Sequence, residues 1–470
     1  MNEVMPLWSH QQAALNWLQL KKNNHASGVM LAMGMGTGKT RIAIEWMKSQ
    51  RDSQCPYPNI VFCPKPVLDV WARQLNMFGG DLEPLILNGN ASLWNRSLAI
   101  ERFITNGRPT CGKVVVLNYE SLAAAPNDAI SKSIICRQWA CAILDESHRI
   151  KAAKGLRSKL LNKIKAMFRF KIAMTGTPMP HSPDDIYGQF RFLNSDVLGT
   201  THQAFKYKYA IMQNRPGIPV PIITGWKNQD DLAARLQPHM LNVNRDDVLD
   251  LPPEVHVERF VELEDSARTM YDELKNDMIT WYRGNGTEAE PVTTTNALVR
   301  LLRLQQITGG FATTDDHRII PVSKVKAEAL GEVLEELSPQ EPVIVLCRYK
   351  ADIDAATETC RAAGRTVAML RGQCDELNFF QNGGASVLVA QQQCAKEGID
   401  LTRAHYCVLW SINWSLGDYE QALARLRRPG QEAKKVVYIH LIASNTVDED
   451  LRKALIAKKF DVMSVLERMR

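Results

Sequence analysis

The first 180 residues contain short apolar runs separated by longer amphipathic or polar stretches. The runs are VMLAM (29–33), IVFC (60–63), PLIL (84–87), KVVVLN (113–118), CAIL (141–144) and KIAM (171–174). Because each run is continuously apolar rather than alternating, both faces of the sheet that they form should be covered. Parallel strands also need crossover connections, which are usually helices. The pattern predicts an α/β lobe built on a parallel sheet.

A second series of strand-sized runs lies in the last third of the chain. These runs are VIVLC (343–347), TVAML (366–370), SVLVA (386–390), YCVLW (406–410) and KVVYIHLI (435–442). Between the two series, residues 180–250 are rich in Pro, Gly, Asn and aromatic residues, and residues 262–310 look helical with a polar insert. We therefore predict two tandem parallel-sheet lobes, residues 1–250 and 251–470. The first should carry a protrusion after residue 180, and the second a helical protrusion at 262–310.

The composition excludes several classes of protein. The chain has 470 residues, 45% of them hydrophobic, and a net charge of +6, which rules out a disordered or fibrous protein. Its 10 cysteines show no C-x-x-C spacing, so neither a zinc site nor a disulfide framework is indicated. No run approaches the roughly 18 apolar residues of a membrane helix, and the N-terminus lacks a secretory pattern. We expect a cytoplasmic protein, bacterial or in a phage-infected host, without membrane association.

The sequence LAMGMGTGKT (31–40) stands between a predicted strand and a predicted helix, the context of a phosphate-binding loop. Its glycines allow successive backbone N–H groups to face one anion, Lys39 can reach the β and γ phosphates, and Thr40 can hold Mg²⁺. The usual first glycine is replaced by Met33, so only the G-x-G-K-T core is present. The alternative is a glycine-rich turn that binds no nucleotide and is followed by a Lys-Thr pair by chance. The candidate nucleotide-binding residues here are Gly34, Gly36, Thr37, Gly38, Lys39 and Thr40.

Two adjacent acids, Asp145 and Glu146, follow the apolar run ACAIL. A strand that ends in carboxylates places them at the carboxyl edge of a parallel sheet, where Asp145 could hold Mg²⁺ and Glu146 could orient the attacking water. Alternatively, the D-E-S-H sequence could cap the next helix. The segment MTGTPMPH (174–181) follows another predicted strand and offers hydroxyl groups to the same edge.

A basic sequence near the C-terminus, QALARLRRPGQ (421–431), supplies candidate catalytic arginines. Arg425 and Arg428 are three residues apart, which would place both on one face of a helix. Such arginines could meet a γ-phosphate and stabilise the charge of the transition state. The alternative is an ordinary solvated basic helix end.

These motifs, in this order, resemble the Swi/Snf-type ATPases of helicase superfamily two. The resemblance covers about residues 5–455 and rests on LWSHQ (7–11), GMGTGKT, IVFCPKPVLDVW (60–71), VVVLNYESL (114–122), DESH, MTGTP, LPPEV (251–255) and QALARLRRPGQ. It implies two RecA-like lobes, ATP hydrolysis at their interface, and tracking along double-stranded DNA. Two departures, Pro180-His181 and Ser415-Leu416, bear on how hydrolysis would be coupled to movement.

The resemblance also implies roles for individual residues. Gln11 would read adenine, and Gln421 would stand beside the candidate catalytic arginines, Arg425 and Arg428. Five further residues fall in segments that, in this family, approach the DNA backbone or relay its binding: Pro64, Lys65, Tyr119, Arg348 and Gly398.

Positive charge is concentrated between Arg149 and Lys171, where nine of 23 residues are basic and none is acidic. Apolar residues at helical spacing, among them Leu156 and Leu161, predict a helix that packs on the sheet and shows its basic side outward. Arg157, Lys159 and Lys163 are therefore candidate phosphate contacts, because such contacts need no base recognition. A solvated basic face is the alternative.

We expect a monomeric, DNA-stimulated ATPase that uses ATP and Mg²⁺ to translocate on duplex DNA. It would remodel branched DNA or complexes of DNA with DNA-bound proteins, in replication, recombination or repair. Two alternatives stay open: a strand-separating helicase on DNA or RNA, and a nucleotide switch that binds ATP without moving. A complete hydrolytic set argues against the switch.

Overall fold

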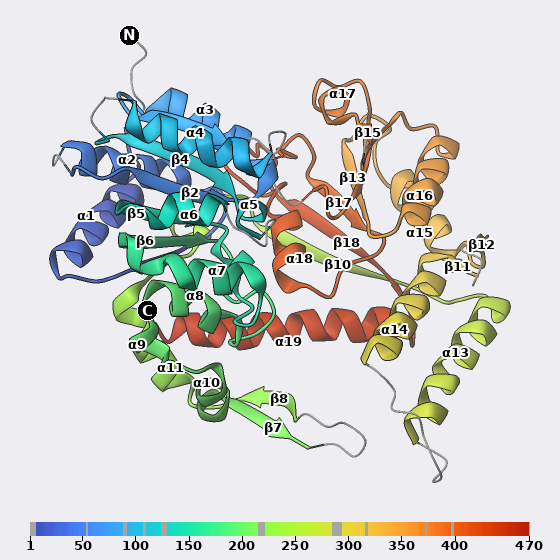
Figure 1. The fold of residues 1–470 in the computed structure, drawn as a ribbon. Coiled ribbons are helices and arrows are strands. Elements are labelled where there is room, and N and C mark those ends of the chain that lie inside the picture. Colours follow the sequence, from blue (N-terminus) through green and yellow to red (C-terminus); the bar gives the residue numbers. More distant parts are fainter. Residues whose placement is uncertain are drawn as a thin grey trace. The chain divides into compact units, whose positions relative to one another are not determined.

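The computed structural model describes residues 6–469 except for 53–54, 88–91, 107–109, 124–128, 215–220, 284–293, 315–317, 373 and 396–398. The chain forms two compact units (Figure 1). Unit 1 contains Met1–Asp250 and Phe460–Arg470, and unit 2 contains Leu251–Lys459. The last eleven residues, which we expected in the second lobe, thus cluster with the first. Among the described residues, no helix is both long and apolar enough to cross a membrane.

Unit 1 is built on a seven-stranded sheet in the order β3-β4-β2-β5-β6-β1-β9. Every pairing between its described strands is parallel. The strands are β1 (Val29–Met33), β2 (Asn59–Cys63), β3 (Glu83–Leu87), β4 (Lys113–Asn118), β5 (Trp139–Asp145), β6 (Phe168–Thr175) and β9 (Met240–Val243). All the strands predicted for this unit form.

Helices cover this sheet, and their apolar faces make the main core. Ala14, Ile42 and Leu75 represent the three helices α1, α2 and α3, which pack on the sheet in one cluster. The helices are α1 (Ser9–Asn23), α2 (Lys39–Asp52), α3 (Leu68–Phe78), α4 (Leu93–Thr105), α5 (Glu120–Ala123), α6 (Ala129–Ile135), α7 (Leu156–Ile164), α8 (Asp185–Leu193), α9 (Ser195–Leu198), α10 (His202–Tyr209), α11 (Gln229–Leu236) and α12 (Arg245–Val248). Short 3₁₀ turns are η1 (Lys65–Val67), η2 (Ser147–Ile150), η3 (Lys165–Met167) and η4 (Gln237–His239). The region after residue 180 also holds a hairpin, β7 (Ala210–Gln213) with β8 (Ile222–Trp226).

Unit 2 has its own seven-stranded sheet in the order β10-β18-β17-β13-β16-β14-β15. Its described pairings are parallel except that between β14 and β15. The strands are β10 (Glu254–Val261), β13 (Val343–Cys347), β14 (Val367–Arg371), β15 (Cys374–Asp375), β16 (Val387–Gln391), β17 (Tyr406–Leu409) and β18 (Val436–Ala443), with a separate hairpin of β11 (Phe311–Thr313) and β12 (Ile319–Pro321). The predicted fold class, two α/β lobes with parallel sheets, is confirmed.

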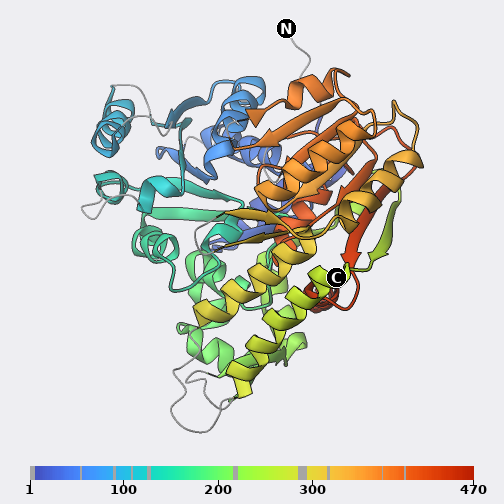
Figure 2. The same cartoon turned by 90° about the vertical axis from the view of Figure 1, so that its right-hand side faces the viewer.

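Four helices of unit 2 form two groups. Those in the first group, α15 and α16, pack on the sheet through residues such as Leu330 and Ile353. In the second group, α13 and α14 contact each other and extend away from the sheet (Figure 2), within the segment expected as a helical protrusion. The bounds are α13 (Asp265–Arg283), α14 (Thr294–Gly309), α15 (Val325–Glu335), α16 (Lys350–Ala362), α17 (Leu377–Gln381), α18 (Leu416–Leu423) and α19 (Val447–Glu467).

Candidate functional site

The loop between β1 and α2 has the backbone geometry of a phosphate cradle. Gly36 and Gly38 have φ values of 84° and 80°, in the left-handed region that favours glycine. A Cβ atom on Gly38 would lie 2.1 Å from Nε2 of Gln11, so a larger residue does not fit without a shift. The loop opens α2, a 14-residue helix whose first N–H groups face the same space. This donor set fits a chain of phosphates.

The ammonium of Lys39 lies inside this loop. It donates hydrogen bonds to the carbonyl oxygens of Met33, at 2.9 Å, and Gly34, at 3.1 Å. The hydroxyl of Thr37 also donates to the Gly34 carbonyl, at 2.8 Å. Met33 replaces the usual glycine, and its backbone carbonyl accepts one of the hydrogen bonds that hold Lys39. This contact does not depend on the side chain at position 33. Thr40 lies in the first turn of α2, next to Lys39.

The amide of Gln11 links the phosphate loop to the start of α1. Its Nε2 donates to the carbonyl of Thr37 at 3.2 Å, and its Oε1 accepts from the backbone N–H of Trp8 at 3.0 Å. One N–H and one lone pair of this amide remain for a base edge. His10, which sequence reasoning missed, also bonds the Thr37 carbonyl through Nε2, at 2.9 Å.

Asp145 ends β5 as a buried carboxylate held on several sides. Its Oδ2 accepts from the indole Nε1 of Trp71 at 2.8 Å, and its Oδ1 accepts from the backbone N–H of Glu146 at 3.1 Å. Burial, and then the charge of Glu146, raise the pKa of Asp145 to about 6, while Trp71 and Lys39 oppose this rise. A buried carboxylate beside a second acid is a suitable ligand for Mg²⁺, because the cation offsets the cost of burying the negative charge.

Glu146 lies in a strained backbone conformation and contacts the TGTP segment. Its φ is 50°, which is uncommon for a residue other than glycine. Its Oε2 lies 3.3 Å from Nδ1 of His148 and 3.5 Å from the hydroxyl of Thr175. The same hydroxyl lies 3.2 Å from His148 Nδ1 and accepts from the backbone N–H of Thr177 at 3.1 Å. The acidic pair and the TGTP segment therefore form one hydrogen-bonded group, to which His148 is an addition that the sequence motif alone did not assign.

A second contact ties the acidic segment to the helix that follows TGTP. The hydroxyl of Ser147 donates to Oε1 of Gln189 at 2.7 Å, and Nε2 of Gln189 donates to the carbonyls of Pro178, at 2.6 Å, and Asp185, at 2.9 Å. Gln189 is completely buried on α8. The replaced positions Pro180 and His181 lie just before this helix, and the backbone N–H of His181 donates to Asp185 Oδ2 at 2.7 Å.

The candidate arginines of unit 2 do not lie on a helix, so that part of the sequence prediction is wrong. Helix α18 ends at Leu423, and the carbonyl of Arg425 accepts a bond from the backbone N–H of Leu401 at 3.2 Å. The turn is completed by Pro429, which offers no N–H, and by Gly430 with a φ of 97°.

Within this turn the arginines have different environments. Arg427 is buried and donates through Nε to the carbonyl of Pro252 at 2.6 Å, which suits a structural role. Arg425 and Arg428 are half-buried, and Nη1 of Arg428 donates to the carbonyl of Ile399 at 3.3 Å. Gln421 is buried on α18.

The candidate DNA-contact residues are not equally accessible. Lys65 is exposed at the start of η1, directly after the buried Pro64. Arg348 is half-buried, bonds the side chain of Gln305, and lies 5.2 Å from the ring centre of Tyr349. Gly398 lies outside the described residues.

Tyr119 is completely buried, and its hydroxyl donates to the carbonyl of Asp145 at 2.8 Å. The resemblance implies that Tyr119 either approaches the DNA backbone or relays DNA binding. A buried side chain can relay binding but cannot touch the DNA. Burial also raises the pKa of Tyr119 well above its ordinary value, which keeps the hydroxyl a donor.

The basic segment around α7 divides into internal and surface residues. Lys171 is buried in β6, and Lys165 donates to the carbonyl of Arg191 at 2.9 Å. Arg157 pairs with Glu120 at 2.9 Å. Lys159 and Lys163 are exposed, as expected for phosphate contacts, and so is Lys154. The predicted apolar stripe is only partly correct, because Leu156 is 57% exposed.

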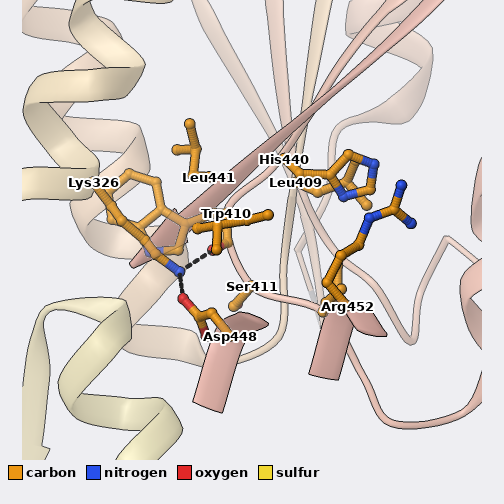
Figure 3. Close-up of a pocket in the computed structure, with 10 residues that line it drawn as sticks. Lys326, Leu409, Trp410, Ser411, His440, Leu441, Asp448 and Arg452 are labelled. Atoms are coloured by element: carbon orange, nitrogen blue, oxygen red, sulfur yellow. Dashed lines mark hydrogen bonds and ion pairs between the residues drawn. The ribbon is translucent and has the colours of Figure 1, made fainter. Parts of the chain in front are cut away.

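A small cavity lies in unit 2 near the ends of β17 and β18. Figure 3 shows its lining, which includes Trp410, Ser411, His440 and Arg452 beside the buried pair of Lys326 and Asp448. Its volume of about 10 Å³ corresponds to roughly one water molecule. It cannot hold a nucleotide.

Comparison with protein families agrees with this arrangement. The family model described as SNF2-related domain matches residues 10–309, and the helicase conserved C-terminal domain matches residues 325–430. The chain belongs to the SNF2-related family. The resemblance to Swi/Snf-type ATPases and the predicted class of enzyme, a helicase-like ATPase, are thereby confirmed.

Relatives of this SNF2-related chain are distant and longer. An uncharacterized ATP-dependent helicase of Mycoplasma genitalium is 24% identical over 95% of this chain and 41% of its own length. The ISWI chromatin-remodeling complex ATPase of Saccharomyces cerevisiae is 24% identical over 94% of this chain and 39% of its own. The DNA repair protein rhp54 of Schizosaccharomyces pombe is 25% identical over 91% and 54%.

Among solved structures, the Sulfolobus solfataricus SWI2/SNF2 ATPase core in complex with dsDNA is 20% identical, with a TM-score of 0.46. The match covers 98% of this chain and 95% of that one. The chain spans about two-fifths to a half of the length of these curated relatives.

Proposed function

We propose that this chain is an ATP-dependent motor that translocates on double-stranded DNA and remodels branched DNA or protein–DNA complexes. The observation that carries the proposal is the meeting of three motifs at the carboxyl edge of one sheet. Strand β6 pairs with both β1 and β5, so Thr175 stands between the phosphate loop and the acidic pair. This is the arrangement that the hydrolysis of a nucleoside triphosphate requires.

The side chains divide the chemistry of hydrolysis among them. Lys39 and the loop N–H groups bind the phosphates, while Thr40 and Asp145 would hold Mg²⁺, which when bound neutralises charge on the β and γ phosphates. Glu146, oriented by His148 and Thr175, accepts a proton from the attacking water and positions it. We assign to Arg425 and Arg428 the stabilisation of charge on the transferred phosphoryl group.

Nucleic acid would be bound by its phosphates. Lys65, Lys159 and Lys163 are exposed cations, which suits contacts to the phosphate backbone that need no base recognition. Relatives named as a chromatin-remodeling ATPase and a DNA repair protein support duplex DNA as the track.

ATP turnover tests this proposal when it is measured without nucleic acid and with single strands, duplexes and four-way junctions. We expect stimulation by duplex or junction DNA, displacement of a third strand from a triplex, and no separation of the duplex. Separation of the strands would instead support a helicase, and turnover that no nucleic acid stimulates would refute the proposed motor.

A further inference from the structure

Two aromatic side chains from different segments each donate a hydrogen bond to Asp145. The indole Nε1 of Trp71, on α3, reaches the carboxylate at 2.8 Å, and the hydroxyl of Tyr119, after β4, reaches the backbone carbonyl at 2.8 Å. Both aromatic residues are completely buried. An indole N–H can only donate, so the Trp71 contact exists only while the carboxylate faces it. The side chain and the main chain of Asp145 are thus held independently.

Each aromatic residue belongs to a segment that also reaches the surface. The 3₁₀ turn η1 runs directly into α3, so the exposed Lys65 and the buried Trp71 lie on one continuous helical piece. On the other side, Tyr119 precedes Glu120, which pairs at 2.9 Å with Arg157 on the basic helix α7. The first segment therefore carries an exposed cation, Lys65, and the second carries an acid that is ion-paired with the basic helix α7.

The two segments also contact each other. The backbone N–H of Tyr119 donates to the carbonyl of Cys63 at 3.2 Å, and Cys63 lies two residues before η1. The ring of Tyr119 stacks on Phe62 with ring centres 6.4 Å apart. The two segments are therefore packed against each other, and close packing of this kind lets a shift of one act on the other.

We propose that Trp71 and Tyr119 are positioning residues that transmit the binding of a nucleic-acid phosphate backbone, at Lys65 and α7, to the orientation of Asp145. The inference rests on the proposed function, in which Asp145 holds Mg²⁺. Binding of the polyanion moves η1 and α3 as one piece, and the indole N–H then sets the direction of the carboxylate. The stimulation of ATP turnover by DNA depends in this way on two hydrogen bonds that touch neither DNA nor nucleotide.

The test uses variants that delete the donor and keep most of the ring. Trp71→Phe removes the indole N–H, and Tyr119→Phe removes only the hydroxyl. Trp139→Phe is the matched control, because Trp139 is also completely buried and its Nε1 donates to a carbonyl, that of Ile134, at 3.1 Å. Trp139 lies at the start of β5, the opposite end of the strand from Asp145.

Two readouts separate a positioning role from simple packing: the Mg²⁺ concentration that gives half-maximal binding of a fluorescent ATP analogue, and the ratio of turnover with and without duplex DNA. Because a hydrogen bond to a charged group is involved, Trp71→Phe should raise the half-maximal Mg²⁺ concentration about tenfold. It should also lower the stimulation ratio, and Tyr119→Phe should lower the ratio alone. Trp139→Phe should change neither by more than about twofold.

The inference is overturned if Trp71→Phe and Tyr119→Phe match Trp139→Phe in both readouts. Thermal unfolding of each variant checks that the fold is retained, and Tyr119→Phe, which removes one atom, keeps the test decisive if Trp71→Phe does not fold. If the parent chain hydrolyses ATP without stimulation by DNA, the proposed motor fails. In that case an unchanged Mg²⁺ requirement of Trp71→Phe separately excludes its role at Asp145.

Discussion

The ammonium of Lys326 lies 2.6 Å from Oδ2 of Asp448 inside unit 2, where the two side chains are 2% and 8% exposed. Lys326 also donates to the carbonyl of Trp410 at 2.8 Å, and Asp448 accepts from the hydroxyl of Thr308 at 2.9 Å. The pair thus joins α15, α19, α14 and the end of β17, as Figure 3 shows for its central members. A buried pair with further hydrogen bonds to its surroundings holds these elements in one arrangement.

Replacing Lys326 with Met should destabilise the chain strongly, because it leaves the carboxylate of Asp448 buried without its cation. We expect a loss of about 3–5 kcal/mol in the free energy of unfolding, measured by denaturant titration. The double variant Lys326→Met with Asp448→Leu should recover much of the loss, since it removes both charges. A single variant as stable as the parent would contradict a structural role for the pair.

Lys39→Ala and Glu146→Gln should abolish ATP turnover in different ways. Removing the Lys39 ammonium takes away the charge that binds the phosphates, so ATP binding itself should weaken. Glu146→Gln keeps the size of the side chain but cannot accept a proton, so ATP should bind and remain unhydrolysed. Binding of a fluorescent ATP analogue, followed alongside phosphate release, distinguishes the two. Turnover by the Gln variant at more than about 1% of the parental rate would remove Glu146 from the role of base.

The stability of unit 1 should depend on pH through Lys171. Burial, and then the charge of Lys165, lower the pKa of Lys171 from 10.5 to about 8. Between these values the unfolded chain holds a proton that the folded chain has lost, so the free energy of unfolding rises with pH across this window. Lys171→Met removes the cost of burying the charge and should stabilise the protein at pH 7 by about 1–3 kcal/mol.

The advantage of Lys171→Met should shrink as the pH rises through 8 toward 10.5. Denaturant titrations at pH 7 and pH 9.5 measure it, with the exposed Lys159 replaced by Met as a control that should change little at either pH. An advantage that is constant across this range would show that it arises from packing and not from ionisation.

Replacing Lys159 and Lys163 with Glu should weaken duplex binding. If each lysine neutralises one phosphate, the slope of log affinity against log salt concentration should become shallower by about 2. Fluorescence anisotropy at several salt concentrations measures this slope. Glu substitutions at Lys132 and Lys227, which are exposed elsewhere in unit 1, are the control for the general loss of positive charge. Equal slopes in the two double variants would make α7 an ordinary solvated face.

Much of the fold could be predicted because buried parallel strands have continuous apolar runs in the sequence. The runs at 113–118 and 343–347 match β4 and β13 at both ends. Strand β10 was missed, because it lies at an edge of its sheet and its burial alternates, with Phe260 57% exposed. Strand β9 was missed because MLNV is short and half-polar, and pairing with β1 stabilises it.

The candidate site was predictable only where a motif encodes its own local geometry. The glycines of the phosphate loop and the acids at the end of β5 needed no tertiary information. The contacts of Trp71, His148 and Gln189 depend on side chains from separate segments, which a single sequence does not place together. The end of α18 was missed because the bond between Leu401 and Arg425 is a tertiary interaction.

The position of β1 in its sheet has a consequence for synthesis on the ribosome. Its two neighbours are β6 and β9: Val29 is paired with Ile172 of β6, and Met30 with Met240 of β9. While the chain emerges, this fully apolar strand has no native partner until β6 has been made, and such delayed pairing leaves it open to misassociation. The loop that follows β1 acquires its native frame only then, so nascent chains cut short before β6 should bind no nucleotide. Binding of ATP can therefore stabilise only chains in which β1 has already paired within its sheet. The ligand thus favours correctly folded chains late in synthesis.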